Sequence, residues 1–488
     1  MRSKLSFIIF ITIFISLTAK DPIELIYSGK TYFTNEILDT AAGTETLPDS
    51  ALTEGTVLEK INRLLDFYSS KGFPLAKIKV DSIISATTAS SVYLSIDAGD
   101  YVTYNFITFS GNKISRSETL LKQSGLNIKM RFDEEKVNEA AGLIYSTGLF
   151  IKKPEFRIVR PEGEYGIDFV VEERKYIQIS LMGGYSSGDQ DDVFSGTAGL
   201  VFDNIFGTFR KASVYWDRIG KLSEKIKLQY REPFLLRYRI STGFLFEQNY
   251  KKDEFLSRQT GIDEQYTLNS TAYIIAGYKK SYLYTDSLYA GPDNDMVTDR
   301  ISGGVRFANE FISSAIPVSG GYSVSAEIAS LKIDIKDSTV ITGTEIIVHA
   351  GFIKKFRDNF FIKTIFNYDH ILSDSDLPLF GKIYFGGAES LRGFREDFFV
   401  SDIFLLQSAE FYFVPDSKEL SFSLFFDNGL FNIKRKNIEK ISGLHSEQSY
   451  GGGMTVIFGS GEIALTAGIP ARYGIDEGML HLRYSVRF

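Results

Sequence analysis

From Tyr176 to its last residue, the chain consists of short segments in which apolar and polar residues alternate. Because neighbouring side chains of a strand point to opposite faces, such segments form strands with one apolar and one polar face. A membrane barrel, with lipid outside and water inside, needs this pattern, and a soluble β-sandwich would show it too. The final segment favours the barrel, since its polar face carries two arginines and a histidine that suit a water-filled lumen. Its apolar face holds Leu480, Leu482, Tyr484, Val486 and Phe488.

Composition argues against several classes of protein. The net charge of -7 disfavours a nucleic-acid partner, since phosphate binding needs a basic surface. Aromatic residues make up 14% of the chain, which suits aromatic girdles at a bilayer interface. The chain has no cysteine, so disulfides, thiolate metal sites and cysteine nucleophiles are excluded. The histidines lack metal-ligand spacing and no catalytic constellation or phosphate loop emerges, so we expect no enzyme, no cofactor and no metal site.

The first residues have the pattern of a secretory signal. Arg2 and Lys4 precede an apolar run from Leu5 to Leu17, and small residues lead to Ala19, after which cleavage is expected. Residues 1–19 are therefore predicted to be a signal peptide, with an uncleaved anchor as the alternative. The signal predicts that the chain is exported, although beyond it no apolar run is long enough for a membrane-spanning helix. We therefore expect a periplasmic, secreted or outer-membrane protein.

The region between this signal and Tyr176 contains an internal repeat. The segment IYSGKTYFTNEIL from Ile26 matches TFSGNKISRSETL from Thr108, and YSSKGF matches YSTGLF further along each copy. Apolar residues in each copy first recur at helical spacing and then alternate as in strands. We therefore predict two small α+β domains, at residues 21–99 and 102–174, each ordered as a strand, two helices and two strands.

The stretch 386–397, GGAESLRGFRED, lies between two strand-like segments. Its glycines permit backbone turns that a side chain would forbid. If this turn enters a barrel lumen, the guanidinium of Arg392 needs a carboxylate partner, because an unpaired charge is costly away from water. Two later strands each place one acid among aromatic residues, Glu410 and Asp427. Taken alone, a single acid in an apolar strand is more often a solvated lumen or loop-end residue than a specific partner.

This arrangement resembles the BamA/TamA superfamily of outer-membrane assembly and secretion barrels. Further matches fall in the family's order: DNIFG from Asp203, REPFLL from Arg231, FFDNG from Phe425, and the glycine-rich segment from Gly451 to Pro470. That family has a lumen-inserted loop with a [VIL]RG[FY] tip, whose arginine pairs with acids of the next two strands.

The resemblance implies a fold and a site. The fold is a transmembrane antiparallel β-barrel of about sixteen strands at residues 176–488, preceded by two POTRA domains at 21–99 and 102–174. The segment ending at Phe488 is similar to an outer-membrane targeting signal. The implied loop tip is Leu391, Arg392, Gly393 and Phe394, and the implied arginine partners are Glu410 and Asp427.

The resemblance also implies a function in the cell outer membrane, with the N-terminal domains in the periplasm. POTRA domains would receive unfolded outer-membrane proteins, and the seam between the first and last barrel strands would open to template new strands. Lipid and possible accessory periplasmic proteins would be the other partners, with no nucleic acid. Across the seam we expect Ile179 to lie near Val486.

Two other functions fit part of the sequence. A two-partner secretion transporter has the same domains and loop tip, but normally carries a plug helix and linker ahead of the first POTRA domain. Here only Lys20 to Pro22 separate the predicted signal from the first strand. A passive porin or surface adhesin would have no use for the repeat or for the Arg392 loop.

Overall fold

The structure of the protein is a computed structural model. It describes residues 23–43, 54–85, 90–186, 193–219, 223–235, 239–252, 255–285, 295–309, 316–317, 319–336, 339–378, 381–432 and 444–488. The predicted signal peptide, residues 1–19, lies outside the described residues.

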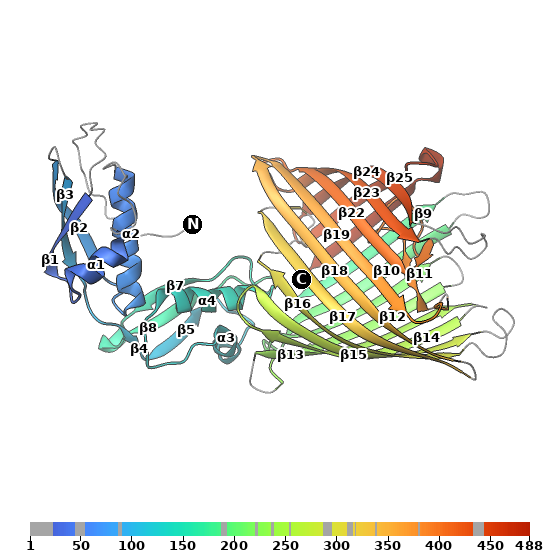
Figure 1. The fold of residues 1–488 in the computed structure, drawn as a ribbon, viewed down its shortest axis with the longest axis horizontal. Coiled ribbons are helices and arrows are strands. Elements are labelled where there is room, and N and C mark those ends of the chain that lie inside the picture. The colour runs from blue at the N-terminus through green and yellow to red at the C-terminus, as the bar shows by residue number, and fades with distance from the viewer. Residues whose placement is uncertain are drawn as a thin grey trace. The chain divides into compact units, whose positions relative to one another are not determined.

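Sixteen antiparallel strands of the described residues form a closed barrel (Figure 1). The prediction of an antiparallel barrel of about sixteen strands is therefore confirmed. The strands are β9 (Ile177–Ser186), β10 (Val193–Ile205), β11 (Arg210–Ile219), β12 (Ser223–Glu232), β13 (Ile240–Lys251), β14 (Phe255–Thr267), β15 (Ala272–Thr285), β16 (Met296–Ala308), β17 (Gly321–Ile335), β18 (Val340–Arg357), β19 (Phe360–Ser373), β22 (Ile403–Phe413), β23 (Leu420–Asn432), β24 (Leu444–Phe458), β25 (Gly461–Pro470) and β26 (Met479–Arg487).

The outer face of the wall is apolar because alternate residues turn large hydrophobic side chains outward. On β12, for example, Ile226, Leu228 and Tyr230 are exposed. The residue between the first and second of these, Lys227, belongs to the inner face, as the strand period of two requires. Lipid covers such an outer face in a membrane barrel.

Charged pairs are placed across the inner face. Arg300 of β16 binds Glu327 of β17 through Nη2 at 2.7 Å and Glu345 of β18 through Nε at 2.5 Å. These oxygens and nitrogens come from neighbouring strands, so the pairs tie the wall together side by side. A partly solvated lumen tolerates them where lipid would not.

The barrel closes between its first strand, β9, and its last, β26. The two pair antiparallel from Gln178 opposite Arg487 to Tyr185 opposite Leu480, with Ile179 opposite Val486. The predicted register of the seam is therefore confirmed. Beyond the strand ends, the Phe488 amide donates to the Ile177 carbonyl at 2.8 Å and extends the pairing.

The N-terminal region contains two smaller sets of elements. The first has a strand, two helices and two strands, and the second has two additional two-residue strands, one of them between its helices. The first set has a sheet ordered β1-β3-β2, and the second has a sheet ordered β5-β8-β7 with a separate β4-β6 pair. The first set comprises β1 (Ile23–Lys30), α1 (Asn35–Ala42), α2 (Glu54–Ser70), β2 (Lys77–Ser85) and β3 (Ser90–Asp97). The second comprises β4 (Thr103–Tyr104), β5 (Phe106–Ser110), α3 (Ser117–Ser124), β6 (Met130–Arg131), α4 (Glu134–Tyr145), β7 (Glu155–Val159) and β8 (Gly166–Val170).

An apolar core lies between the helices and the sheet of the first set. Leu38 of α1, Leu64 and Tyr68 of α2, and Leu94 of β3 are fully buried in it. The helical spacing seen in the sequence thus corresponds to the buried face of α2. None of the helices among the described residues is long and apolar enough to cross a membrane.

The chain divides into two compact units. One contains Met1–Thr108, Leu126–Glu139 and Phe156–Phe169, and the other contains Phe109–Gly125, Ala140–Glu155 and Val170–Phe488. The second unit therefore joins the barrel with α3 and the last part of α4.

Because all the wall strands come from residues after Tyr176, the barrel should form without the N-terminal elements. We expect a chain in which residues 23–174 are deleted behind the signal to give a folded, heat-modifiable barrel. The measurement is the shift in electrophoretic mobility between unboiled and boiled samples. A deleted chain with no folded band would contradict this independence.

Candidate functional site

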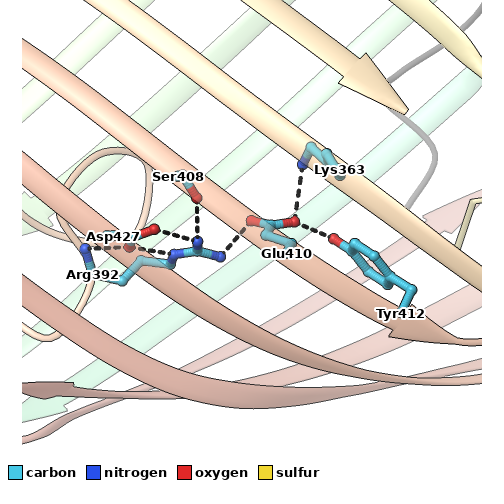
Figure 2. A network of polar contacts seen from close by, with 6 residues as sticks. All are labelled: Lys363, Arg392, Ser408, Glu410, Tyr412 and Asp427. Carbon is cyan, nitrogen blue, oxygen red and sulfur yellow. Dashed lines mark hydrogen bonds and ion pairs between the residues drawn. The ribbon is translucent and has the colours of Figure 1, made fainter. Parts of the chain in front are cut away.

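The candidate site lies on the segment 374–402, which joins β19 to β22. Part of it forms a hairpin of β20 (Ile383–Phe385) and β21 (Phe399–Ser401). The residues between these strands form a turn that carries the loop tip, Leu391 to Phe394, onto the inner face of the wall. Figure 2 shows Arg392 of this tip extended along that face.

Two glycines and a glutamate shape the turn. Gly386 and Gly387 have φ angles of +120° and +97°, which residues with side chains rarely adopt. A Cβ on Gly387 would stand 2.0 Å from the carboxyl carbon of Glu396. That space is taken because Glu396 folds back and accepts the Ala388 amide at 2.8 Å. The glycine is therefore needed for the turn to close on itself.

Apolar packing fixes the residues on either side of Arg392. Leu391 is fully buried and Phe394 nearly so, in a cluster with Phe385, Phe404 and other residues of the wall. The rings of Phe385 and Phe404 stack with centroids 3.9 Å apart. Burial of these large rings stabilises the loop against the wall.

The backbone of the tip lies directly on strand β25. Gly393 has a φ of +92°, and its nitrogen would be 2.6 Å from a Cβ placed on Gly468. Only a residue without a side chain allows two backbones to approach this closely. Gly468 belongs to the glycine-rich segment noted in the sequence, and the loop tip explains why it is a glycine.

Arg392 binds both predicted acids (Figure 2). Its Nε and Nη2 donate to the two carboxylate oxygens of Asp427 at 2.8 and 2.6 Å, a bidentate pair. Its Nη1 donates to Glu410 Oε1 at 2.6 Å, and Nη2 also donates to Ser408 Oγ at 2.9 Å. Planar guanidinium donors match carboxylate oxygens in this way, and such charge-assisted bonds are stronger than neutral ones.

The strand register explains why two acids meet one arginine. Ser408 and Glu410 lie two residues apart on β22 and so share its inner face. On β23, Asp427 pairs with Ser408, and Phe425 pairs with Glu410. The two acids therefore stand diagonally across two strands. Sequence reasoning offered them as separate candidates, and the structure brings them together.

Glu410 has two further partners that sequence reasoning did not identify as such. Its Oε2 lies 3.3 Å from Lys363 Nζ and also accepts the hydroxyl of Tyr412. Lys363 lies directly opposite Glu410 in the pairing of β19 with β22. Alternation places Tyr412 on the same face as Glu410. Lys363, however, lies on β19, and its pairing with β22 depends on a register that is set across the whole intervening segment 374–402.

The face of the guanidinium is also occupied. The Arg392 guanidinium carbon lies 3.7 Å from the centroid of the Phe425 ring, a cation–π contact. The ring can lie there because residue 451, opposite it on β24, is a glycine: a Cβ at Gly451 would be 2.5 Å from the ring. Gly451 thus makes room for the Phe425 ring.

The network balances its charges away from solvent. Asp427 is 0% exposed and Glu410 is 4% exposed. Two cations, Arg392 and Lys363, neutralise these two carboxylates. Removing one member of a buried pair typically costs about 3–5 kcal/mol, because the remaining charge stays without a partner, and less where water can enter.

A cavity of about 510 Å³ lies on the other side of the loop. Glu389, Glu396 and Asp397 line it from the loop, and Lys225 of β12 and His481 of β26 are among the wall residues that line it. The loop is thus bound to strands β22 to β25 and leaves open space next to β9 to β12. Among the described residues, no group of three or more His, Asp or Glu could hold a metal ion.

The predicted residues of the last strand do not join this network. Leu480, Leu482 and Phe488 are exposed on the outer face, whereas His481 and Ser485 are buried on the inner face. The apolar residues of β26 therefore face lipid, and its polar residues face the lumen that contains the loop.

Comparison with known proteins agrees with this geometry. Residues 327–478, which span the loop and its partners, match the Omp85 superfamily domain. The chain carries an Omp85 superfamily domain. The resemblance to the BamA/TamA superfamily is thereby confirmed for this part of the chain. A comparison with curated proteins finds no sequence match.

Solved structures of low sequence identity share the fold of this chain. BamA from Haemophilus ducreyi lacking POTRA domains 1-3 is 15% identical, with a TM-score of 0.54, and the alignment covers 95% of this chain and 99% of that one. CdiB from Escherichia coli is 13% identical, with a TM-score of 0.62, covering 98% and 93%. CdiB from Acinetobacter baumannii is 12% identical, with a TM-score of 0.59, covering 96% and 90%.

The network predicts that Arg392→Ala releases the loop from the wall. Asp427 would lose a bidentate partner at a fully buried position, so the tip should become accessible to protease at Phe394 while the barrel stays heat-modifiable. Arg392→Lys should give an intermediate result, because an ammonium keeps the charge but cannot bind bidentately.

Arg395→Ala is the matched control. This arginine lies in the same loop, and its side chain forms no ion pair with the described residues, so its removal should leave the tip protected. Equal protease sensitivity of Arg392→Ala and the parent protein would contradict the proposed anchoring.

Proposed function

We propose that this protein inserts and assembles other outer-membrane proteins, using the seam between β9 and β26 as a template. The proposal deepens the family assignment, which covers both assembly and secretion barrels. The observation that carries it is the length of the strands around the wall.

The seam lies on the short side of the wall, where β11, β12 and β25 also have only 10 residues each. Strands β9 and β26 have 10 and 9 residues, whereas β17 and β18, across the barrel, have 15 and 18. About 9–11 residues are just enough for a tilted strand to cross the hydrocarbon core. Fewer backbone hydrogen bonds thus need to break at the seam than between the longer strands.

An open seam would expose two strand edges with unpaired amides and carbonyls. Such edges pair readily with another strand, and in lipid, which offers no hydrogen bonds, the drive to pair is strong. An incoming strand could add to β9 by β-augmentation, without hydrolysis of a nucleotide. The loop anchored on β22 to β25, and the cavity beside β9 to β12, leave space on the inner side of this edge.

The N-terminal elements fit a role in receiving unfolded chains. We propose that residues 21–99 and 102–174 are POTRA domains in the periplasm and that residues 1–19 are the signal that exports the chain. In the first domain β2 lies at the edge of its sheet, and Ile83 and Ile84 on it are exposed. An edge strand of this kind can bind an extended segment of a client. Accessory periplasmic proteins could bind the same domains.

Secretion of a protein through the lumen is the second candidate. It is favoured by the structural likeness to the two CdiB proteins, whose TM-scores exceed that of BamA. In that function the loop would have to leave the lumen, and the seam could stay closed. The two functions therefore differ in which contact must break.

A disulfide engineered across the seam distinguishes assembly from secretion. Because Ile179 and Val486 lie directly opposite each other, their Cα atoms should be about 4.5–5.5 Å apart, within reach of a bridge. The chain has no cysteine that could form another pair. With cysteines at both positions, we expect oxidation to stop assembly of client barrels in reconstituted vesicles and reduction to restore it.

A second pair provides the matched control. Ile262 of β14 and Tyr278 of β15 are directly opposite, outward-facing and away from the seam, so a bridge between them should leave assembly unchanged. Undiminished assembly with the seam bridge demonstrably formed would reject lateral opening and favour transport through the lumen.

A further inference from the structure

The turn between β10 and β11 has an unusual backbone. Asn204, Phe206 and Phe209 have φ angles of +52°, +54° and +62°, and Gly207 between them has +72°. Residues other than glycine seldom adopt this left-handed region, and each such residue costs free energy. Three of them within one short turn persist only where surrounding contacts outweigh that cost. The turn contains the DNIFG motif, which the loop site does not explain.

The contacts come from the segment 113–116, which precedes α3. Asn204 Nδ2 donates to Ser115 Oγ at 2.8 Å in a buried hydrogen bond, and Asn204 Oδ1 accepts the Phe209 amide at 3.0 Å. The Arg116 amide donates to the Gly207 carbonyl at 3.0 Å. Asn204 therefore links the fold of its own turn to the segment that docks on it.

The two backbones also approach each other closely. A Cβ on Gly207 would be 2.0 Å from the carbonyl oxygen of Ile114. Together with the left-handed φ of Gly207, this leaves glycine as the residue that fits. The turn is thus shaped to receive the segment 113–116.

Glu173 holds that segment from the other side. Its Oε2 accepts the amides of Lys113 at 2.8 Å and Ile114 at 3.0 Å, and its Oε1 accepts the amide of Ser115 at 2.8 Å. Three successive amides around one carboxylate form an anion-binding nest. Burial by itself raises the pKa of the Glu173 carboxyl, but the hydrogen bonds from Ser115 and the three amides bring the pKa below its ordinary value. The group is therefore ionised at neutral pH.

Apolar packing surrounds these polar contacts. Leu120 of α3, Ile144 of α4 and Phe150 form one buried cluster with Tyr176 and Phe209 of the barrel. The rings of Phe150 and Phe209 meet edge to face with centroids 6.2 Å apart. This side of the second repeat and the first turns of the barrel thus share one small core.

Backbone hydrogen bonds also connect this turn to β9, the first strand of the seam. The Asp203 amide donates to the Tyr176 carbonyl at 2.7 Å, and Phe202 pairs with Ile177 at the start of β9. Any displacement of the turn would therefore pull on β9.

We propose that Glu173, the segment 113–116 and the turn 204–209 form a coupling joint through which the second N-terminal repeat positions strand β9. In this joint Glu173 is a positioning residue, since it acts through the segment 113–116. The inference goes beyond the proposed function, because it holds whether the barrel inserts client strands or secretes through its lumen.

Hydrogen exchange of the full-length protein in lipid vesicles tests the joint. Glu173→Gln replaces one acceptor oxygen by an amide donor that faces the same backbone amides, so exchange at residues 113–115 should rise by about tenfold. If the joint positions β9, exchange at residues 177–182 should rise as well, while β16 to β18 stay unchanged. The loop tip should remain protected from protease.

Glu172→Gln is the matched control. It makes the same chemical change one residue earlier, on an exposed side chain whose ion pair with Lys152 spans 3.9 Å and is worth little. This variant should exchange like the parent protein at both sites.

A reversible crosslink gives a second test, which does not depend on how Glu173→Gln folds. Cysteines at Ser115 and Asn204 remove the buried hydrogen bond, so exchange in β9 should be fast in the uncrosslinked protein. A short, reducible bis-thiol crosslinker should return it to the parent rate, and reduction should reverse this. Heat-modifiability confirms that the barrel is folded in each state. Exchange in β9 that is the same with and without the crosslink, or a Glu173→Gln effect confined to residues 113–115, would overturn the proposal.

Discussion

A partly buried guanidinium between two buried carboxylates sets the requirements for the loop and for the wall around it. Arg392 can sit on the inner face only because Asp427 and Glu410 supply three strong hydrogen bonds there. Those acids must lie diagonally across β22 and β23, which fixes the register of the two strands. The tip must also lie flat on β25, which requires glycine at residue 468. A single charge in a poorly hydrated place thus determines features that are far apart in the sequence.

This anchoring divides the barrel into parts with different tasks. Strands β22 to β25 carry the loop and its charged network. Strands β9 and β26 meet on the short side of the wall, and the turn after β10 receives the segment 113–116. A lumen cavity of about 510 Å³ lies between the loop and strands β26 and β9 to β12. The loop-bearing strands adjoin the seam on its β26 side, because β25 pairs with β26. Lateral opening needs one side of the seam to hold its shape while the other parts.

The features that could be predicted from the sequence are those that follow from the alternation of side chains along a strand. Once one face of β9 and β26 must meet lipid, a shift by one residue would expose the wrong face, so Ile179 could be placed near Val486 in advance, to within one residue pair. Other features depend on which segments become neighbours although they are far apart in the sequence. Lys363 meets Glu410 across the segment 374–402, and Ser115 of the second N-terminal repeat meets Asn204 of the barrel. No local sequence pattern indicates such a long-range contact, so these residues could not be predicted.

The most direct test of this account is a double-mutant cycle between Arg392 and Asp427. The free energy of unfolding of the barrel in lipid vesicles would be measured for the parent, Arg392→Met, Asp427→Asn and the double variant. If the pair holds the loop as described, each single change leaves the other group without its partner. The coupling energy should then be about 2 kcal/mol or more. A coupling energy below about 0.5 kcal/mol, as for independent sites, would contradict the account.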